Sequence, residues 1–168
     1  GGARAVSMEV SSHALDLLRV DSVFFDVCVF TNLTRDHLDF HKTMDAYIRA
    51  KARLFREVLK KSTKKKKRAI INVDDAHSNA MTSPEIPVWT YGLKKGNIQA
   101  AEINLSLDGS QFEARTPLGN FSVQMKLIGQ HNVSNSLAAI GVGLHAGLSP
   151  SDIVKSLGAL SGVKGRLE

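Results

Sequence analysis

An aspartate- and histidine-rich segment follows a short apolar run early in the chain. Residues 31–41 read Thr-Asn-Leu-Thr-Arg-Asp-His-Leu-Asp-Phe-His, and residues 26–30 before them read Asp-Val-Cys-Val-Phe. Such a run is typical of a short buried strand, and open α/β sheets bind ligands at the carboxyl ends of their strands. Carboxylates and imidazoles, such as that of His37, are metal ligands. The segment therefore predicts a metal and phosphate site.

Lys51 stands where a helix should be apolar. Between Met44 and Leu59 the apolar residues recur at helical spacing, and Lys51 falls on their stripe. Full burial there would lower the pKa of its ammonium group by roughly 3–5 units, which favours the free amine. A free amine can add carbon dioxide and become a carbamate, a carboxylate-like metal ligand. The alternative is that Lys51 lays its stem over the stripe and keeps its charge in water.

A second group of polar residues lies at the first predicted strand-to-helix junction. Glu9 falls near the end of a strand-like segment, residues 5–10, and Ser11 and Ser12 open a helix that we expect to end near Arg19. A carboxylate followed by hydroxyl groups at a helix start suits a magnesium ion whose phosphate partners also meet backbone amides. The alternative is that one serine only caps the helix.

Zinc is a second reading of the histidines. His37 and His41 are four residues apart and could lie on one face of a helix. No third soft ligand stands at a spacing typical of zinc sites. The sequence therefore disfavours zinc at these histidines.

Composition points to one ordinary core and no nucleic-acid partner. The chain has 168 residues, 43% of them hydrophobic, and a net charge of +6. Residues 60–68 carry seven basic residues, no acidic residue and no interleaved aromatic residue. This pattern predicts a solvated, dispensable loop after the Lys51 helix. A nucleic-acid groove is the alternative.

Cysteine usage and hydropathy bear on the compartment. Cys28 is the only cysteine, so no disulfide is expected within the chain and a reducing compartment is the natural reading. No apolar run reaches the length of a membrane span, and no signal peptide is visible. We expect a cytoplasmic monomer without membrane contact. The abrupt ends suggest an incomplete fragment of a longer protein.

Strands and helices alternate along the first half of the chain. Strand-like segments cover residues 5–10, 26–30, 69–73 and 88–91, with helices after the first two and a short helix after the third. This order predicts an α/β fold, a mostly parallel sheet flanked by helices. Alternating residues from 97 to 127 predict a small antiparallel sheet, and two helices follow, at 131–145 and from a serine cap at Ser149.

Several long motifs in one order resemble the Mur ligase family. They occupy nearly the whole chain, at residues 9–15, 31–39, 47–55, 72–75, 90–92, 129–139 and 165–168. The resemblance implies that residues 1–168 form the central, P-loop-like nucleotide-binding domain. It implies an ATP-dependent amide ligase of peptidoglycan synthesis. That enzyme would add meso-diaminopimelate or L-lysine to UDP-N-acetylmuramoyl-L-alanyl-D-glutamate through an acyl phosphate.

The resemblance also assigns roles to the metal-side residues. The lysine matching Lys51 is carbamylated in the family, as N6-carboxylysine, and helps to hold the second of two magnesium ions with the histidine matching His37. The glutamate matching Glu9 serves the magnesium ion bound between the nucleotide phosphates. Lys51 and His37 are therefore the expected catalytic residues, and all three are expected metal ligands.

Substrate contacts follow from the same resemblance. Residues matching Ser11 and Arg19 contact the muramyl precursor, although the family often has glutamine where this chain has Leu17. Residues matching Asn135 and Arg166 contact ATP.

Parts of the family pattern are absent from these residues. The glycine-rich phosphate loop, the Asn-Thr-Thr motif and the first and third domains do not occur in the sequence. Without the loop the main phosphate cradle is gone, so we expect the chain alone to be inactive. The alternatives are another amide ligase of the superfamily, of folylpolyglutamate or cyanophycin type, and a non-catalytic binding module.

Overall fold

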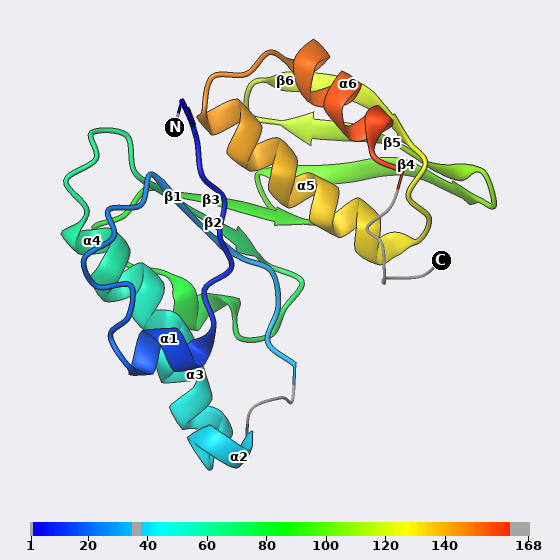
Figure 1. Cartoon of the computed structure of the whole chain (residues 1–168). Coiled ribbons are helices and arrows are strands. Elements are labelled where there is room, and N and C mark those ends of the chain that lie inside the picture. Colours follow the sequence, from blue (N-terminus) through cyan, green and yellow to red (C-terminus); the bar gives the residue numbers. More distant parts are fainter. Residues whose placement is uncertain (1, 35–37, 162–168) are drawn as a thin grey trace.

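Six strands form one sheet in the order β1-β2-β3-β4-β5-β6 (Figure 1). The computed structural model describes residues 2–34 and 38–161. The strands are β1 (Val27–Phe30), β2 (Arg68–Asn72), β3 (Val88–Gly92), β4 (Ile98–Ser106), β5 (Gly109–Thr116) and β6 (Gly119–Met125). Strands β1 to β4 pair in parallel, and β4 to β6 form an antiparallel meander. The predicted α/β class is confirmed, with the meander joined to the parallel strands in one sheet.

Helices cover both faces of this sheet (Figure 1). They are α1 (Ser12–Asp16), α2 (Leu38–His41), α3 (Met44–Arg53), the π-helical segment η1 (Leu54–Val58), α4 (Leu59–Lys61), the 3-10 helix η2 (Ser78–Met81), α5 (Gln130–His145) and α6 (Pro150–Ala159). The group from α1 to α4 packs against one face of the parallel strands, α5 packs against the other, and α6 lies over β6.

Alternation along β1 supplies both sides of the core. Cys28 and Phe30 belong to the apolar cluster shared with α1, α3 and α4, whereas Val27 and Val29 pack against the cluster shared with α5. Such alternation is the period of a strand covered on both faces. Burial raises the pKa of the Cys28 thiol to about 12, so the thiol is protonated at neutral pH.

The predicted long helix exists, but it is not α-helical throughout. Its apolar stripe is buried as expected, including Tyr47, Phe55 and Val58. At η1 the hydrogen bonding changes, because the Leu59 N–H donates to the carbonyl of Leu54, five residues back.

The N-terminal predictions need correction. Residues 5–10 are extended but are not a strand, because a strand needs a paired neighbour and this segment has none in the described part of the sheet. The first helix ends at Asp16, well before Arg19. It ends there because Leu18 adopts a left-handed conformation, with a φ of 57°.

The C-terminal predictions are confirmed. Helix α5 ends before Gly147, which has a φ of 83°, and the Ser149 hydroxyl accepts the Asp152 N–H at the start of α6. Across residues 2–34 and 38–161, no helix has the length and apolar character needed to cross a bilayer.

The basic run begins in α4 and continues through a loop into β2. Lys60 pairs with Glu85 at 2.6 Å, and Lys64 pairs with Asp26 at 3.3 Å. Lys67 departs from the expectation of a dispensable, solvated loop, since its Nζ donates to the carbonyls of Lys60 and Ser62 at the end of α4. These bonds satisfy carbonyl groups that a helix end leaves without partners.

This difference separates the lysines experimentally. Replacing Lys64, Lys65 and Lys66 together by glycine and serine should change the free energy of unfolding by no more than about 0.5 kcal/mol, because exposed ion pairs contribute little. Lys67→Ala should lower it by about 0.5–1.5 kcal/mol, since it removes two hydrogen bonds from a charged donor. Urea denaturation measures both. Equal effects of the two variants would refute the capping role of Lys67.

Candidate functional site

The Glu9 carboxylate lies within electrostatic range of Lys51 on helix α3. Lys51 is half-buried on α3, and Glu9 is exposed in the extended segment before α1. Burial lowers the pKa of the Lys51 ammonium group, and the nearby Glu9 carboxylate opposes this shift. The structure therefore confirms the predicted direction of the Lys51 pKa shift and places the Glu9 carboxylate within electrostatic range of it. The third predicted metal ligand, His37, lies outside the described residues.

A row of rings leads from α1 to Lys51, and the sequence analysis did not anticipate it. The His13 ring centroid lies 4.1 Å from that of Phe40 and 5.6 Å from that of His41. His41 stacks on Tyr47 at 5.2 Å, and the Lys51 Nζ lies 5.8 Å from the Tyr47 centroid. Tyr47 is the ring next to Lys51, and His41, Phe40 and His13 continue the row toward α1. The sequence signal for the contact between Tyr47 and Lys51 is their spacing of four residues, which places both on one face of a helix.

The zinc reading gains no support from the described residues. His41 is buried against Tyr47, and no group of three or more histidine, cysteine, aspartate or glutamate side chains in residues 2–34 and 38–161 could hold a metal. A magnesium ion at Glu9 and Lys51 would need His37 or groups outside this part of the chain. The half-buried Lys51, whose pKa is lowered by burial, does fit the carbamate that such a site would require.

The two predicted precursor contacts lie at opposite ends of α1. The Ser11 hydroxyl accepts the Ala14 N–H at 3.1 Å and so caps the helix. The capping role that the sequence offered as an alternative is therefore confirmed for Ser11. Ser12 is fully buried, and its hydroxyl has no hydrogen-bond partner among the described residues. Arg19 is exposed in the turn that follows the helix.

The predicted ATP contacts are not brought to Lys51 by the described structure. Asn135 is exposed in the second turn of α5, on the opposite face of the sheet from α3 (Figure 1). Arg166 lies outside the described residues.

Side chains at the ends of β2 and β3 fasten the loop that follows β1. Asn72 donates from Nδ2 to the carbonyl of Thr31 at 2.7 Å, and the Asp75 Oδ2 accepts the N–H of Leu33 at 2.8 Å. Tyr91 donates its hydroxyl hydrogen to the carbonyl of Phe30 at 3.2 Å. This loop enters the predicted metal segment, so these three side chains set where the segment begins.

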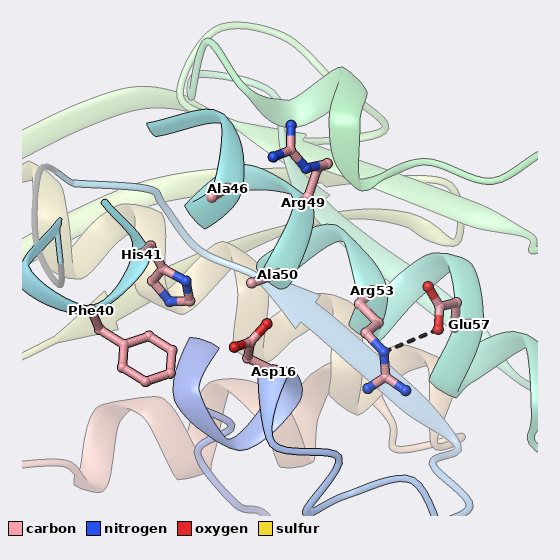
Figure 2. Close-up of a pocket in the computed structure, with 8 residues that line it drawn as sticks. All are labelled: Asp16, Phe40, His41, Ala46, Arg49, Ala50, Arg53 and Glu57. Carbon is pink, nitrogen blue, oxygen red and sulfur yellow. Dashed lines mark ion pairs between the residues drawn. The ribbon is translucent and has the colours of Figure 1, made fainter. Parts of the chain in front are cut away.

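A pocket of about 430 Å³ opens between α1, α2 and α3 (Figure 2). Its lining residues are Asp16, Phe40, His41, Ala46, Arg49, Ala50, Arg53 and Glu57. Arg53 pairs with Glu57 at its edge. Lys51 lies on α3, one of the helices that form this pocket.

Comparison with known proteins identifies the family of the chain. Residues 1–143 match the family of the Mur ligase middle domain. The chain belongs to the Mur ligase family. Helix α6 and the residues after it lie beyond the matched range.

Two relatives show how the match extends. A UDP-N-acetylmuramoyl-L-alanyl-D-glutamate–2,6-diaminopimelate ligase from Geobacter metallireducens is 46% identical over 99% of the chain. A UDP-N-acetylmuramoyl-L-alanyl-D-glutamate–L-lysine ligase from Staphylococcus haemolyticus is 44% identical over 99% of the chain. The chain spans about one third of the length of each, at 33% and 34%.

A solved structure gives the same result for the fold. A UDP-N-acetylmuramoyl-L-alanyl-D-glutamate–2,6-diaminopimelate ligase superposes with a TM-score of 0.83 at 34% identity, covering 95% of this chain and 33% of that one. A MurF ligase from Thermotoga maritima in complex with ADP has a TM-score of 0.73 at 18% identity, covers 94% of this chain and 35% of its own, and shows the shared fold.

The fastening of the β1 loop can be tested by removing one carboxylate. Asp75→Ala should lower the free energy of unfolding by about 1–3 kcal/mol, because it leaves the N–H groups of Leu33 and His77 without their acceptor. Amide hydrogen exchange at residues 31–34 should accelerate, as measured by mass spectrometry.

Asp74 offers a matched control. Its Oδ2 accepts the N–H of Leu93 in the loop after β3, at 2.7 Å. Asp74→Ala should therefore accelerate exchange near residue 93 and leave residues 31–34 unchanged. Faster exchange at residues 31–34 in the Asp74 variant, and not in the Asp75 variant, would contradict the assignment.

Proposed function

We propose that this chain is the middle domain of an ATP-dependent ligase that adds a diamino acid to UDP-N-acetylmuramoyl-L-alanyl-D-glutamate. The observation that carries the proposal is sequence identity of 42–46%, over nearly the whole chain, to relatives named as diaminopimelate or L-lysine ligases of this precursor. The partial burial of Lys51, within electrostatic range of the Glu9 carboxylate, supports it independently, because a lysine on a helix is ordinarily exposed to water.

In the proposed reaction, the γ-phosphoryl group of ATP passes to the D-glutamate carboxylate, giving an acyl phosphate and ADP. The amine of the diamino acid attacks the acyl carbon, phosphate leaves, and the nitrogen loses a proton. Magnesium ions would neutralise phosphate charge during the transfer. Glu9, His37 and Lys51 would hold these ions, with Asn135 and Arg166 toward the nucleotide and Ser11 and Arg19 toward the precursor.

Lys51 would serve as a carbamate. Its free amine attacks carbon dioxide, a nitrogen–carbon bond forms, and a proton is released. The burial that lowers the pKa of this amine increases the fraction that can react at neutral pH. The product is a negatively charged ligand on a rigid helix.

The described residues do not favour a particular diamino acid. Relatives named for diaminopimelate and for L-lysine are nearly equally similar, at 46% and 44% identity. Among the other solved structures, a mutant of L. casei FPGS has a TM-score of 0.69 at 17% identity, which shows a shared fold only. Ligation of the muramyl dipeptide by the purified full-length protein, followed as ADP release that depends on the precursor, tests the proposal.

Lys51→Ala provides a test of the carbamate. In the full-length ligase this variant should lose activity, because a metal ligand is gone, and short carboxylates such as formate should restore part of it. The wild-type lysine should carry an added mass of about 44 Da when the site is assembled under bicarbonate. Lys61→Ala is the control, since Lys61 is exposed on the same helical run and should need no rescue. Full activity of the Lys51 variant without any carboxylate would refute the role.

The chain of 168 residues should bind Mg-ATP only weakly. Its sequence lacks a glycine-rich phosphate loop, so the backbone amides and lysine that cradle phosphates are missing. Titration calorimetry should give a dissociation constant on the order of millimolar, worth about 4 kcal/mol. The full-length ligase is the positive control. Micromolar binding by the short chain would show that the nucleotide site lies within it.

A further inference from the structure

Arg53 joins three parts of the chain at the edge of the pocket in Figure 2. Its Nη1 donates to the carbonyl of Leu15, the penultimate residue of α1, at 2.8 Å. The same guanidinium pairs with both carboxylate oxygens of Asp21, at 2.8 and 2.5 Å. Its Nε lies 3.0 Å from the Glu57 carboxylate within its own helical run.

The contacts of Arg53 with Leu15 and Asp21 are partly buried, and its contact with Glu57 is more exposed. The Arg53 side chain is 16% exposed and that of Asp21 is 25% exposed, whereas Glu57 is 52% exposed. Two parallel hydrogen bonds between guanidinium and carboxylate are stronger and more directional than a single ion pair. The Arg53 hydrogen bond also lowers the pKa of Asp21, so the pair is charged throughout the neutral range. The contacts toward Leu15 and Asp21 therefore dominate over the contact toward Glu57.

The segment held in this way includes Arg19. Helix α1 has only five residues and is too short to be stable without tertiary contacts. It ends in a Schellman motif, in which the N–H of Leu18 donates to the carbonyl of Leu15 and the N–H of Arg19 donates to the carbonyl of Ala14. Leu18 is left-handed, which is unfavourable for a leucine and requires support from its surroundings.

Arg53 supplies that support from both sides of the turn. It binds the Leu15 carbonyl before Leu18 and the Asp21 side chain after it, so the backbone of Arg19 is enclosed between two fixed points. The Arg19 side chain itself remains exposed. An exposed arginine on a firmly held turn is suited to recognise an anionic ligand.

We infer that Arg53 is a positioning residue for the muramyl precursor, acting through Arg19 by fastening the turn of residues 15–21 to α3. This inference rests on the proposed function, in which Arg19 contacts the precursor. Arg53 itself touches no substrate in this assignment.

The test measures steady-state kinetics of the full-length ligase. Arg53→Gln should raise the KM for the precursor about tenfold, as expected when a charged contact is misplaced, and leave the KM for ATP within about twofold. Glu57→Gln is the matched control: it removes only the contact within the helical run, so both KM values should stay within about twofold of wild type. Asp21→Asn should also raise the precursor KM, because it weakens the same pair. This variant replaces Arg53→Gln in the test if Arg53→Gln does not fold.

A double variant distinguishes positioning from general stability. If Arg53 acts through Arg19, Arg53→Gln added to Arg19→Ala should change the precursor KM by no more than about twofold beyond Arg19→Ala alone. Amide exchange of residues 14–22 should accelerate in Arg53→Gln and not in Glu57→Gln.

Several results would overturn the inference. These are an unchanged precursor KM in folded Arg53→Gln, a further tenfold rise of that KM in the Arg19→Ala background, or an unchanged KM in Arg19→Ala itself. A full-length protein that never ligates the precursor would refute the proposed function instead. The exchange experiment would then still decide whether Arg53 fastens the turn, and unchanged exchange would overturn that as well.

Discussion

The helical run from Met44 to Lys61 must bury one face against the sheet, and the candidate site depends on this packing. Tyr47, Phe55 and Val58 fill the core on that face. Because the run is held by these apolar side chains, its remaining positions are fixed in space at little additional cost in conformational entropy. Lys51 and Arg53 occupy two such positions. Lys51 is half-buried within electrostatic range of Glu9, and Arg53 reaches α1 and the turn after it.

The sequence predicted most of this fold because its patterns are local. Hydrophobic spacing located β1 to β3, the Lys51 helix and α5, and turn residues located the meander. The segment 5–10 was predicted wrongly as a strand, since pairing depends on a neighbouring strand that residue types in the segment do not reveal. The early end of α1 was missed because a leucine at a left-handed position carries no sequence signal, unlike glycine.

The candidate site was predictable in part. The position of Lys51 on an apolar stripe foretold the direction of its pKa shift, and the structure confirms it. The row of rings and the contacts of Arg53 join residues that are distant in the chain, such as His13 with His41 and Leu15 with Arg53. Such pairings follow from tertiary packing and could not be read from spacing. The assigned ligand roles of Glu9, His37 and Asn135 stay predictions.

The π-helical segment at Leu54–Val58 separates two registers within one helical run. A π-helical turn contains about one residue more than an α-helical turn, so each residue after it is rotated by roughly 100° relative to an uninterrupted α-helix. The α-helical spacing that relates Lys51 to Arg53 therefore does not extend to Leu59, which follows the segment. The turn therefore absorbs one extra residue locally: a single-residue deletion within Leu54–Val58 would restore a regular α-helix and leave Leu59 facing the core.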